Sequence, residues 1–352
     1  MIAACTGVGR RPNCAAMATI QDVARAAGVS TATVSRVLSN PDIVAPPTRD
    51  RVMRAVQALR YTPNVIAKML RTHRTDKILV TVPDISNPFF GRVIRGVEEA
   101  AHTAGYSVLL GDTWQRAERE ERFGEMLYRK EADGLIFLGH RLPDSIGPLL
   151  VQLGGRAPVV NGCEFSPELE VSSAHIDNAA AAKEVMDHLY GLGHHRIGVI
   201  TGELRSPISR DRLAGVRLAA KEHGALDNLM IEPGSFAIES GFDNALHLMD
   251  RNRALTAIFC FSDELAMSAM AAVRQRGKRC PEDISIAGFD DMHFSEYLSP
   301  PLTTVRQPAE TIGRETVRLL LDIILGDAKT VENVTLPHHL IVRDSTASPL
   351  PT

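Results

Sequence analysis

The sequence lacks the features that mark several large classes of protein. No run of about 18 consecutive apolar residues occurs among its 352 residues, which excludes a membrane-spanning helix. The first 16 residues hold no apolar stretch ahead of a cleavage site, so we expect no secretory signal. We expect residues 1–17 to form a disordered extension, with Met17 as an alternative start residue.

Cofactor and metal motifs are missing as well. No Gly-x-Gly-x-x-Gly motif follows a β-rich run and no nucleophile–base set stands out, so we expect neither a cofactor nor an enzyme. The five cysteines are odd in number, scattered and without metal-ligand spacing, which is typical of reduced thiols in the cytoplasm. The pairs at 194–195 and 338–339 are histidines without further ligands, so no metal site is predicted.

The most informative stretch that is present, residues 19–39, is typical of two short helices joined by a tight turn. Thr19 suits the start of the first helix, and Asp22 three residues later completes a capping-box pattern. Gly28 suits the end of this helix because glycine tolerates a positive φ angle. Ser30 is a favourable cap for the second helix.

The second helix has one apolar and one polar face. Its apolar residues recur at helical spacing and face inward. The opposite face carries short side chains and one arginine, which suits entry into a DNA major groove: Thr31, Ala32, Ser35 and Arg36. The alternative is an ordinary surface hairpin of helices. A third helix, capped by Thr48 and with Leu59 on its buried face, would close a small core.

Charge is divided unevenly along the chain. Residues 1–75 contain 11 Lys and Arg but only 3 Asp and Glu, whereas the whole chain contains 39 and 42. A basic head therefore precedes an acidic body. Such a head favours a polyanionic partner, because phosphates supply attraction that does not depend on sequence.

From Lys77 onward, short β-rich runs alternate with helical runs in two series. This alternation predicts parallel sheets covered on both faces, arranged as two lobes. In such folds ligands bind beside the carboxyl ends of the strands. The β-rich runs are 78–82, 107–110, 134–138, 158–160, 196–200, 256–260 and 284–289. Polar or aromatic residues suited to a crevice follow several of them: Asp84, Phe89, Phe90, Ser262, Asp263, Asp290 and Asp291.

A series of short motifs runs through the whole chain. They are residues 19–24 with 28–30 and 33–36, then 61–64, 176–178, 193–197, 212–215, 284–290, and 301–305 with 307–308. In order and spacing they resemble the lactose-repressor (LacI/GalR) family of bacterial transcription regulators. Residues 82–85, 88–90, 138–143 and 164–170 further resemble a nucleoside-responsive branch of that family.

The resemblance implies a small all-α helix-turn-helix head and an α/β effector domain that resembles periplasmic binding proteins, with two doubly wound parallel sheets. Its domains would be a DNA-binding head at 18–62, a hinge helix and linker at 63–75, and a two-lobed effector and dimerisation domain at 76–346. The lobes would comprise residues 76–174 with 306–333, and residues 175–303 with the final strand.

The resemblance also implies where DNA is bound. Thr31, Ala32 and Arg36 fall on the family's major-groove readers, and Leu70 falls on the hinge residue that wedges into a minor-groove step. The alternative for Leu70 is a core position in the head. The expected DNA-contacting residues are Thr19, Ser30, Thr31, Ala32, Thr33, Ser35, Arg36, Asn64, Ala67, Lys68 and Leu70.

In the effector domain, Arg212 and Asp290 match the family's recurrent ligand contacts. The alternative for Arg212 is a structural ion pair, and Phe89 or Phe90 is equally compatible with the core. The arginine and threonine that purine-responsive members use correspond to Ser206 and Ile208, which favours a nucleoside or a sugar over a free purine. The expected effector-binding residues are Phe89, Phe90, Cys163, Glu164, Ser206, Ile208, Arg212, Phe236, Asp263 and Asp290.

Together these features predict a cytoplasmic, nucleoid-associated repressor whose affinity for a palindromic operator DNA is set by a small effector. Tetrameric members of the family carry a C-terminal leucine heptad, which is missing here, so we expect a homodimer. The alternative is a two-lobed solute-binding protein that does not act on DNA. The basic head argues against that alternative.

Overall fold

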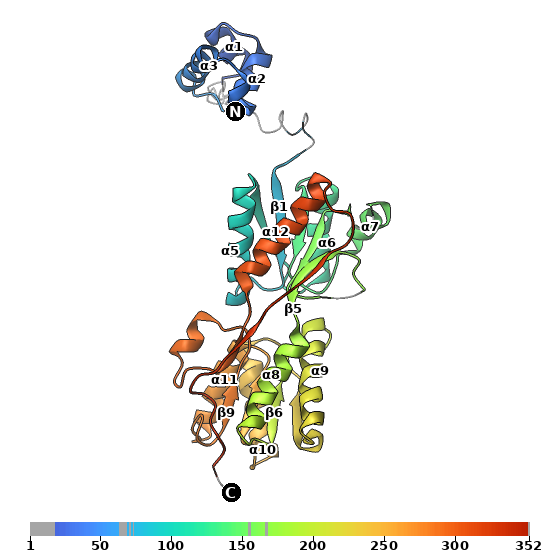
Figure 1. The fold of residues 1–352 in the computed structure, drawn as a ribbon, viewed down its shortest axis with the longest axis vertical. Coiled ribbons are helices and arrows are strands. Elements are labelled where there is room, and N and C mark those ends of the chain that lie inside the picture. The colour runs from blue at the N-terminus through green and yellow to red at the C-terminus, as the bar shows by residue number, and fades with distance from the viewer. Residues whose placement is uncertain are drawn as a thin grey trace, which may run out of the picture. The chain divides into compact units, whose positions relative to one another are not determined.

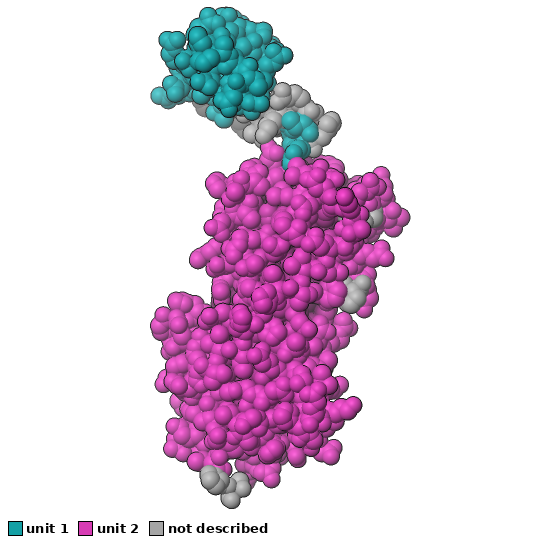
Figure 2. Space-filling model, in the orientation of Figure 1, with its two compact units in different colours: residues 1–74 teal, residues 75–352 magenta. Residues whose placement is uncertain are grey.

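The computed structural model describes residues 18–62, 69, 72, 74–153, 156–165 and 168–350; the remaining residues are grey in Figure 1. The chain divides into two compact units, residues 1–74 and 75–352, which Figure 2 distinguishes by colour. Within the described part of the chain, none of the helices combines the length and apolar character needed to cross a membrane.

The first unit contains the three predicted helices, α1 (Ile20–Ala27), α2 (Thr31–Ser39) and α3 (Pro46–Ala58). The capping box is confirmed, because the Asp22 amide donates to Thr19 Oγ1 at 3.3 Å and the Thr19 amide donates to the Asp22 carboxylate at 3.0 Å. Gly28 ends α1 at a φ of 62°. Ser30 caps α2, accepting a hydrogen bond from the Thr33 amide at 3.1 Å.

A small apolar core joins these helices. Its buried members are Val23, Ala24, Ala27, Val34, Val37, Val52 and Ala55. Two expectations about α3 are wrong. The helix begins at Pro46 and is preceded by Ala45, so Thr48 is not its cap; a proline suits the first helical position because its missing N–H has no partner there. Leu59 follows the helix and is 36% exposed, so it is not on the buried face.

The second unit is built from two lobes. The N-terminal lobe holds a parallel sheet with the strand order β11-β5-β4-β3-β1-β2. Its strands are β1 (Lys77–Val82), β2 (Ser107–Asp112), β3 (Gly134–Phe137), β4 (Val159–Gly162), β5 (Ser172–Ile176) and β11 (Asn333–Leu336). Its helices are α5 (Pro88–Thr103), α6 (Ala117–Tyr128), α7 (Gly147–Leu153) and α12 (Ala309–Leu325).

The C-terminal lobe repeats this layering around a parallel sheet with the strand order β7-β6-β8-β9. The strands are β6 (Ile197–Ile200), β7 (Leu229–Glu232), β8 (Ala257–Cys260) and β9 (Ser285–Ala287). The helices are α8 (Asn178–Gly191), α9 (Pro207–Glu222), α10 (Ile238–Arg251) and α11 (Asp263–Gln275). Short antiparallel strands β10 (Thr304–Arg306) and β12 (His339–Ile341) pair near the crossover, and the chain passes between lobes after β5, β10 and β11.

Alternation along each strand sends side chains to opposite layers. Ile78 and Val80 of β1 pack into the apolar cluster shared with α5 and α12, whereas Leu79 packs into the cluster formed with α6 and α7. In the C-terminal lobe, Val199 joins the cluster with α8 and α9, and Ile200 joins the one with α10 and α11. Both sheets are therefore covered on both faces, as predicted.

Helices α5 and α12 lie side by side in the N-terminal lobe and contact each other through glycines (Figure 1). A Cβ atom added at Gly96 of α5 would overlap the backbone carbonyl of Glu310, and one added at Gly313 of α12 would overlap the carbonyl of Val93. The two backbones touch directly, and neither carbonyl can rotate away without losing its helical hydrogen bond. The lobe therefore requires glycine at both positions.

Replacing Gly96 with alanine is expected to lower the free energy of unfolding of the second unit by about 2 kcal/mol or more, because α5 must move away from α12. Gly91 of the same helix has no atom within 4 Å of its added Cβ, so Gly91→Ala is the matched control. The control should stabilise the helix by about 0.5–1 kcal/mol through its higher helix propensity. Thermal unfolding of both variants decides, and equal melting temperatures would contradict the close approach.

Candidate functional sites: an exposed helix and an interlobe cleft

Helix α2 exposes the face predicted to read DNA. Thr31, Ala32 and Arg36 are exposed, while Val34 and Val37 on the opposite face are buried. The other expected contacts on this unit lie around that face: Thr33 and Ser35 are half-buried, and Ser30 and Thr19 cap α2 and α1. The expected hinge residues Asn64, Ala67, Lys68 and Leu70 lie outside the described residues.

The second unit contains a cavity of about 500 Å³ between its lobes. Residues that follow β1, β4, β6, β7 and β9 line it, so it lies where the carboxyl ends of both sheets meet. Eight of the ten expected effector-binding residues line this cavity: Phe89, Phe90, Cys163, Glu164, Ile208, Arg212, Phe236 and Asp290. Ser206 and Asp263 do not line it.

Arg212 is buried to 3% exposure on α9 and reaches the cavity with a fixed guanidinium. Its Nε donates to Asn178 Oδ1 at 2.9 Å, and its Nη1 donates to the carbonyl oxygen of Phe261. The guanidinium carbon lies 3.5 Å from the centre of the Phe289 ring, within cation–π range. Burial lowers the pKa of Arg212 to about 10, so the group is charged at neutral pH.

Asp290 lies opposite this guanidinium, with Oδ1 at 3.8 Å from Arg212 Nη2. Gln307 Nε2 donates to the same oxygen at 2.6 Å. Burial raises the pKa of Asp290 to about 6, against the opposing influence of Arg212 and Gln307. The backbone φ of Asp290 is 110°, a conformation that non-glycine residues rarely adopt and that is held here by the surrounding structure. Arg212 therefore forms an ion pair and also lines the cavity, so the two interpretations of this residue are compatible.

Aromatic rings cover part of the cavity wall. Phe89 and Phe90 follow β1 and meet edge to face, with ring centres 5.5 Å apart. Phe89 is 7% exposed and belongs to the apolar core, yet it still lines the cavity. Phe236 packs against Gly202 so closely that a Cβ there would overlap its ring. Trp114 is 53% exposed and has the guanidinium of Arg119 at 4.3 Å from its ring centre.

Glu164 connects the lobes at the cavity wall. It follows β4 in the N-terminal lobe, and Ser206 before α9 in the C-terminal lobe donates to its Oε2 at 2.9 Å. His140 Nδ1 lies 3.6 Å from the same oxygen. Burial raises the pKa of Glu164 to about 7. Ser206 thus lies behind a lining carboxylate instead of facing the cavity.

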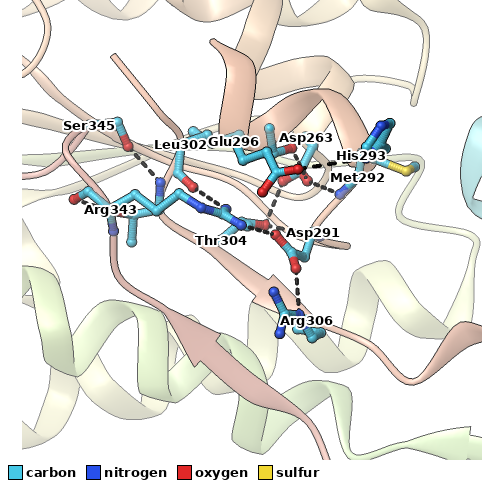
Figure 3. Close-up of polar contacts among 12 residues, drawn as sticks. Asp263, Asp291, Met292, His293, Glu296, Leu302, Thr304, Arg306, Arg343 and Ser345 are labelled. Atoms are coloured by element: carbon cyan, nitrogen blue, oxygen red, sulfur yellow. Dashed lines mark hydrogen bonds and ion pairs between the residues drawn. The ribbon is translucent and has the colours of Figure 1, made fainter. Parts of the chain in front are cut away.

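Asp263 has a structural position that the sequence did not reveal. Its carboxylate accepts hydrogen bonds from the Met292 amide and Thr304 Oγ1 at 2.7 and 2.5 Å (Figure 3). It accepts a third from Ser295 Oγ at 2.6 Å. Burial raises the pKa of this carboxyl to about 8. The expectation that Asp263 faces the crevice is wrong, because these three donors hold it beneath the segment that follows Asp290.

Asp291 is likewise not in the cavity. Arg306 Nε and Arg343 Nη2 lie 2.5 and 2.7 Å from its carboxylate, as Figure 3 shows. Its carbonyl oxygen accepts a hydrogen bond from Arg92 Nη1 of α5 at 3.2 Å. This residue therefore joins the C-terminal lobe to the crossover strands and to the N-terminal lobe.

Several lining residues were not predicted: Asn87, Trp114, Gln115, Glu203, Arg205, Glu264 and Gln307. Trp114 and Gln115 follow β2, and the single tryptophan of the chain beside a strand end was an available signal. Glu264 follows β8 and is adjacent to Asp263, which the sequence predicted to face the crevice. Within the described ranges, no group of histidine, cysteine or carboxylate side chains has the arrangement of a metal site.

Comparison with known proteins identifies the family. Residues 19–64 match the bacterial regulatory proteins of the lacI family, and residues 186–346 match a periplasmic binding protein-like domain. The chain is 40% identical to the HTH-type transcriptional repressor CytR of Escherichia coli (strain K12) over 330 residues, which are 94% of this chain and 96% of the relative. The chain belongs to the LacI family. It is a DNA-binding transcriptional regulator, which confirms the resemblance found in the sequence.

Solved structures agree with this assignment. A crystal structure of the lac repressor dimer bound to operator and the anti-inducer ONPF matches with a TM-score of 0.84 at 28% identity, covering 94% of this chain and 99% of that one. A complex of the transcriptional regulator CelR with cellobiose matches with a TM-score of 0.70 at 33% identity, covering 93% and 99%. The predicted fold class, a helix-turn-helix head with a two-lobed α/β domain, is confirmed.

Replacing Asp263 with alanine is expected to lower the free energy of unfolding by about 3 kcal/mol, because three buried donors lose their acceptor. Asp227 is exposed at the surface of the same lobe, so Asp227→Ala should change stability by less than about 0.5 kcal/mol. Chemical denaturation measures both values. Unchanged stability in the Asp263 variant would show that this carboxylate does not anchor the segment.

Proposed function

We propose that this LacI-family regulator represses transcription and that a nucleoside or a sugar in the interlobe cavity controls its affinity for operator DNA. The pairing of Arg212 with Asp290 beside aromatic rings is the observation that carries the proposal. A guanidinium and a carboxylate bind hydroxyl or heterocyclic groups, and the rings offer faces for a base or a sugar. The proposed effector contacts are the eight expected residues that line the cavity. Ser206 contributes indirectly, because its hydroxyl donates a hydrogen bond to Glu164.

The cavity favours a nucleoside or sugar over a free purine for a local reason. The two positions that purine-responsive members fill with arginine and threonine hold Ser206 and Ile208 here. Ser206 is engaged by Glu164, and Ile208 adds an apolar side chain to the wall. The related CelR structure contains cellobiose, and another LacI-family structure, from Enterococcus faecium, contains ribose.

On the DNA side, we propose that the exposed face of α2 reads base edges in the major groove. The helix is short, is capped at its N-terminus and presents Thr31, Ala32 and Arg36 outward. Residues 63–75 would form the hinge between the head at 18–62 and the effector domain at 76–346. A homodimer would match the two-fold symmetry of a palindromic operator. We further propose that the protein acts in the cytoplasm, bound to the chromosome, and that it is not an enzyme.

Control of DNA binding requires that the effector favours one lobe arrangement over another. Hydrogen bonds join the lobes near the cavity: Ser206 donates to Glu164, Arg92 donates to the carbonyl of Asp291, and Arg205 donates to Gln115. A ligand that contacts Glu164 or Asp290 interacts with residues held by the opposite lobe or by the crossover. Its binding energy therefore depends on the lobe arrangement, which is the physical basis of coupling.

The proposal is tested with purified protein in two assays. Calorimetric titration with nucleosides, sugars and free bases should detect binding by at least one nucleoside or sugar. Fluorescence anisotropy with an operator duplex should then show that the bound compound changes operator affinity. Absence of sequence-specific DNA binding together with retained ligand binding would instead favour a solute-binding protein.

Removal of the Arg36 side chain is expected to reduce discrimination between operator and scrambled duplex by about 1–3 kcal/mol, as for a base contact. The matched control, Arg54→Ala, removes the same charge from the exposed face of α3. Any loss of affinity in the control should be equal for both duplexes, since general attraction to phosphates carries no sequence information. Anisotropy at one salt concentration gives both ratios. An equal loss on both duplexes for Arg36→Ala would contradict base reading.

An Asp290→Asn variant is expected to bind its effector about tenfold more weakly while it keeps operator affinity, because the neutral amide no longer balances Arg212 in the cavity. Asp227→Asn, a surface change in the same lobe, should leave both affinities unaltered. Calorimetry measures effector binding and anisotropy measures operator binding. An unaltered effector Kd in the Asp290 variant would place the ligand elsewhere.

A further inference from the structure

The cavity carries more negative than positive charge on its described lining. Five carboxylates line it, Asp84, Glu164, Glu203, Glu264 and Asp290, against two guanidinium groups, Arg205 and Arg212. Both guanidinium groups already have acidic partners. Arg205 Nε lies 2.5 Å from Glu203 Oε2, and Arg212 faces Asp290 at 3.8 Å.

Arg212 also has limited capacity for a further anion. Its Nε is used by Asn178 and its Nη1 by the Phe261 carbonyl, while the flat face of the guanidinium covers Phe289. The side chain of Arg205 is 62% exposed, and its Nη2 donates a hydrogen bond of 3.5 Å to Gln115 Oε1 at the cavity wall. A phosphate entering this cavity would thus meet compensated cations and uncompensated carboxylates.

Glu264 is a carboxylate of the cavity wall that no cation compensates among the described residues. It follows β8, is the second residue of α11 and is half-buried in the cavity wall. Among the described residues, no side chain or backbone group donates a hydrogen bond to it and no cation pairs with it. Burial raises the pKa of Glu264 to about 7, and repulsion from Asp290 and Asp84 adds to this rise.

The position of Glu264 explains how this carboxylate persists without a protein partner. Glu264 lies in the first turn of α11, where the helix dipole favours a negative charge. Ser262 caps the helix, and the Asp263 carboxylate accepts hydrogen bonds from Met292, Ser295 and Thr304. Neither side chain therefore competes with Glu264 for a ligand. Glu264 is left as an acceptor directed at whatever fills the cavity.

We propose that Glu264 determines effector charge and polarity: it accepts a hydrogen bond from a hydroxyl or amino group of the effector and excludes phosphorylated forms of the same compound. This inference rests on the proposed binding of a nucleoside or sugar in the cavity. Neutral ligands that carry donors supply the missing partner, whereas a dianionic phosphate adds repulsion in a partly desolvated site. Nucleosides and unphosphorylated sugars are therefore bound, and nucleotides and sugar phosphates are not.

The experiment compares matched pairs of compounds by calorimetry at pH 8, above the pKa of Glu264. Each pair is a nucleoside with its 5′-monophosphate, or ribose with ribose 5-phosphate. The wild-type protein should bind the unphosphorylated member at least about tenfold more tightly. Glu264→Gln keeps the shape of the side chain and removes its charge, so the preference should fall by about fivefold or more. Glu282→Gln removes an exposed charge outside the cavity and should keep the wild-type preference.

Three different results would contradict phosphate exclusion, the role of Glu264 or the proposed effector class. Equal affinity of the wild-type protein for both members of a pair contradicts exclusion of phosphate. A preference that is unchanged in Glu264→Gln, with binding retained, contradicts the role of this residue while leaving the proposed function intact. Absence of binding by every unphosphorylated compound, with operator binding retained, overturns the proposed effector class, and the Glu264 inference falls with it.

Discussion

The burial of one guanidinium group, that of Arg212, sets the arrangement of the cleft. A charge that is 3% exposed has to be compensated on every side, or it destabilises the fold by several kcal/mol. Its acceptors come from the start of α8, the end of β8 and the loop after β9, through Asn178, Phe261 and Asp290. One side chain therefore connects the start of α8 with the ends of β8 and β9, and Asp290, which faces this charge, has the unusual φ of 110°.

Around this group, the polar residues separate into those that hold the protein and those left for a ligand. Asp263 and Asp291 have all their oxygens engaged by backbone amides, hydroxyl groups or arginines, and they fix the path of residues 290–306. Glu264, next to Asp263 in the chain, has no such partner among the described residues. Neighbouring carboxylates thus differ in role because a helix directs successive side chains about 100° apart.

Helix starts, strands and cleft residues could be predicted from the sequence where the contacts that determine them lie between residues close together in the chain. The caps of α1 and α2 involve residues three apart, and Thr19 and Ser30 predicted both helix starts. The buried apolar strands were also found, but β5 and β7 were missed. The sequence of β5 is polar, and the Ser173 hydroxyl donates to Asn333, which lies 160 positions away. The cleft positions of Arg212 and Asp290 came from family resemblance. Trp114 could have been predicted from its place beside a strand end, whereas the position of Glu264 depends on packing that no spacing rule contains.

The order of the strands has a consequence for synthesis of the chain. Strand β11 pairs with β5, and α12 covers α5 through Gly96 and Gly313, yet both elements come after the whole C-terminal lobe. A nascent chain that ends before residue 309 therefore presents an open strand edge at β5 and an uncovered face on α5. The N-terminal lobe begins first on the ribosome and is completed last, so its final sheet and helix layer form only after the other lobe has been made.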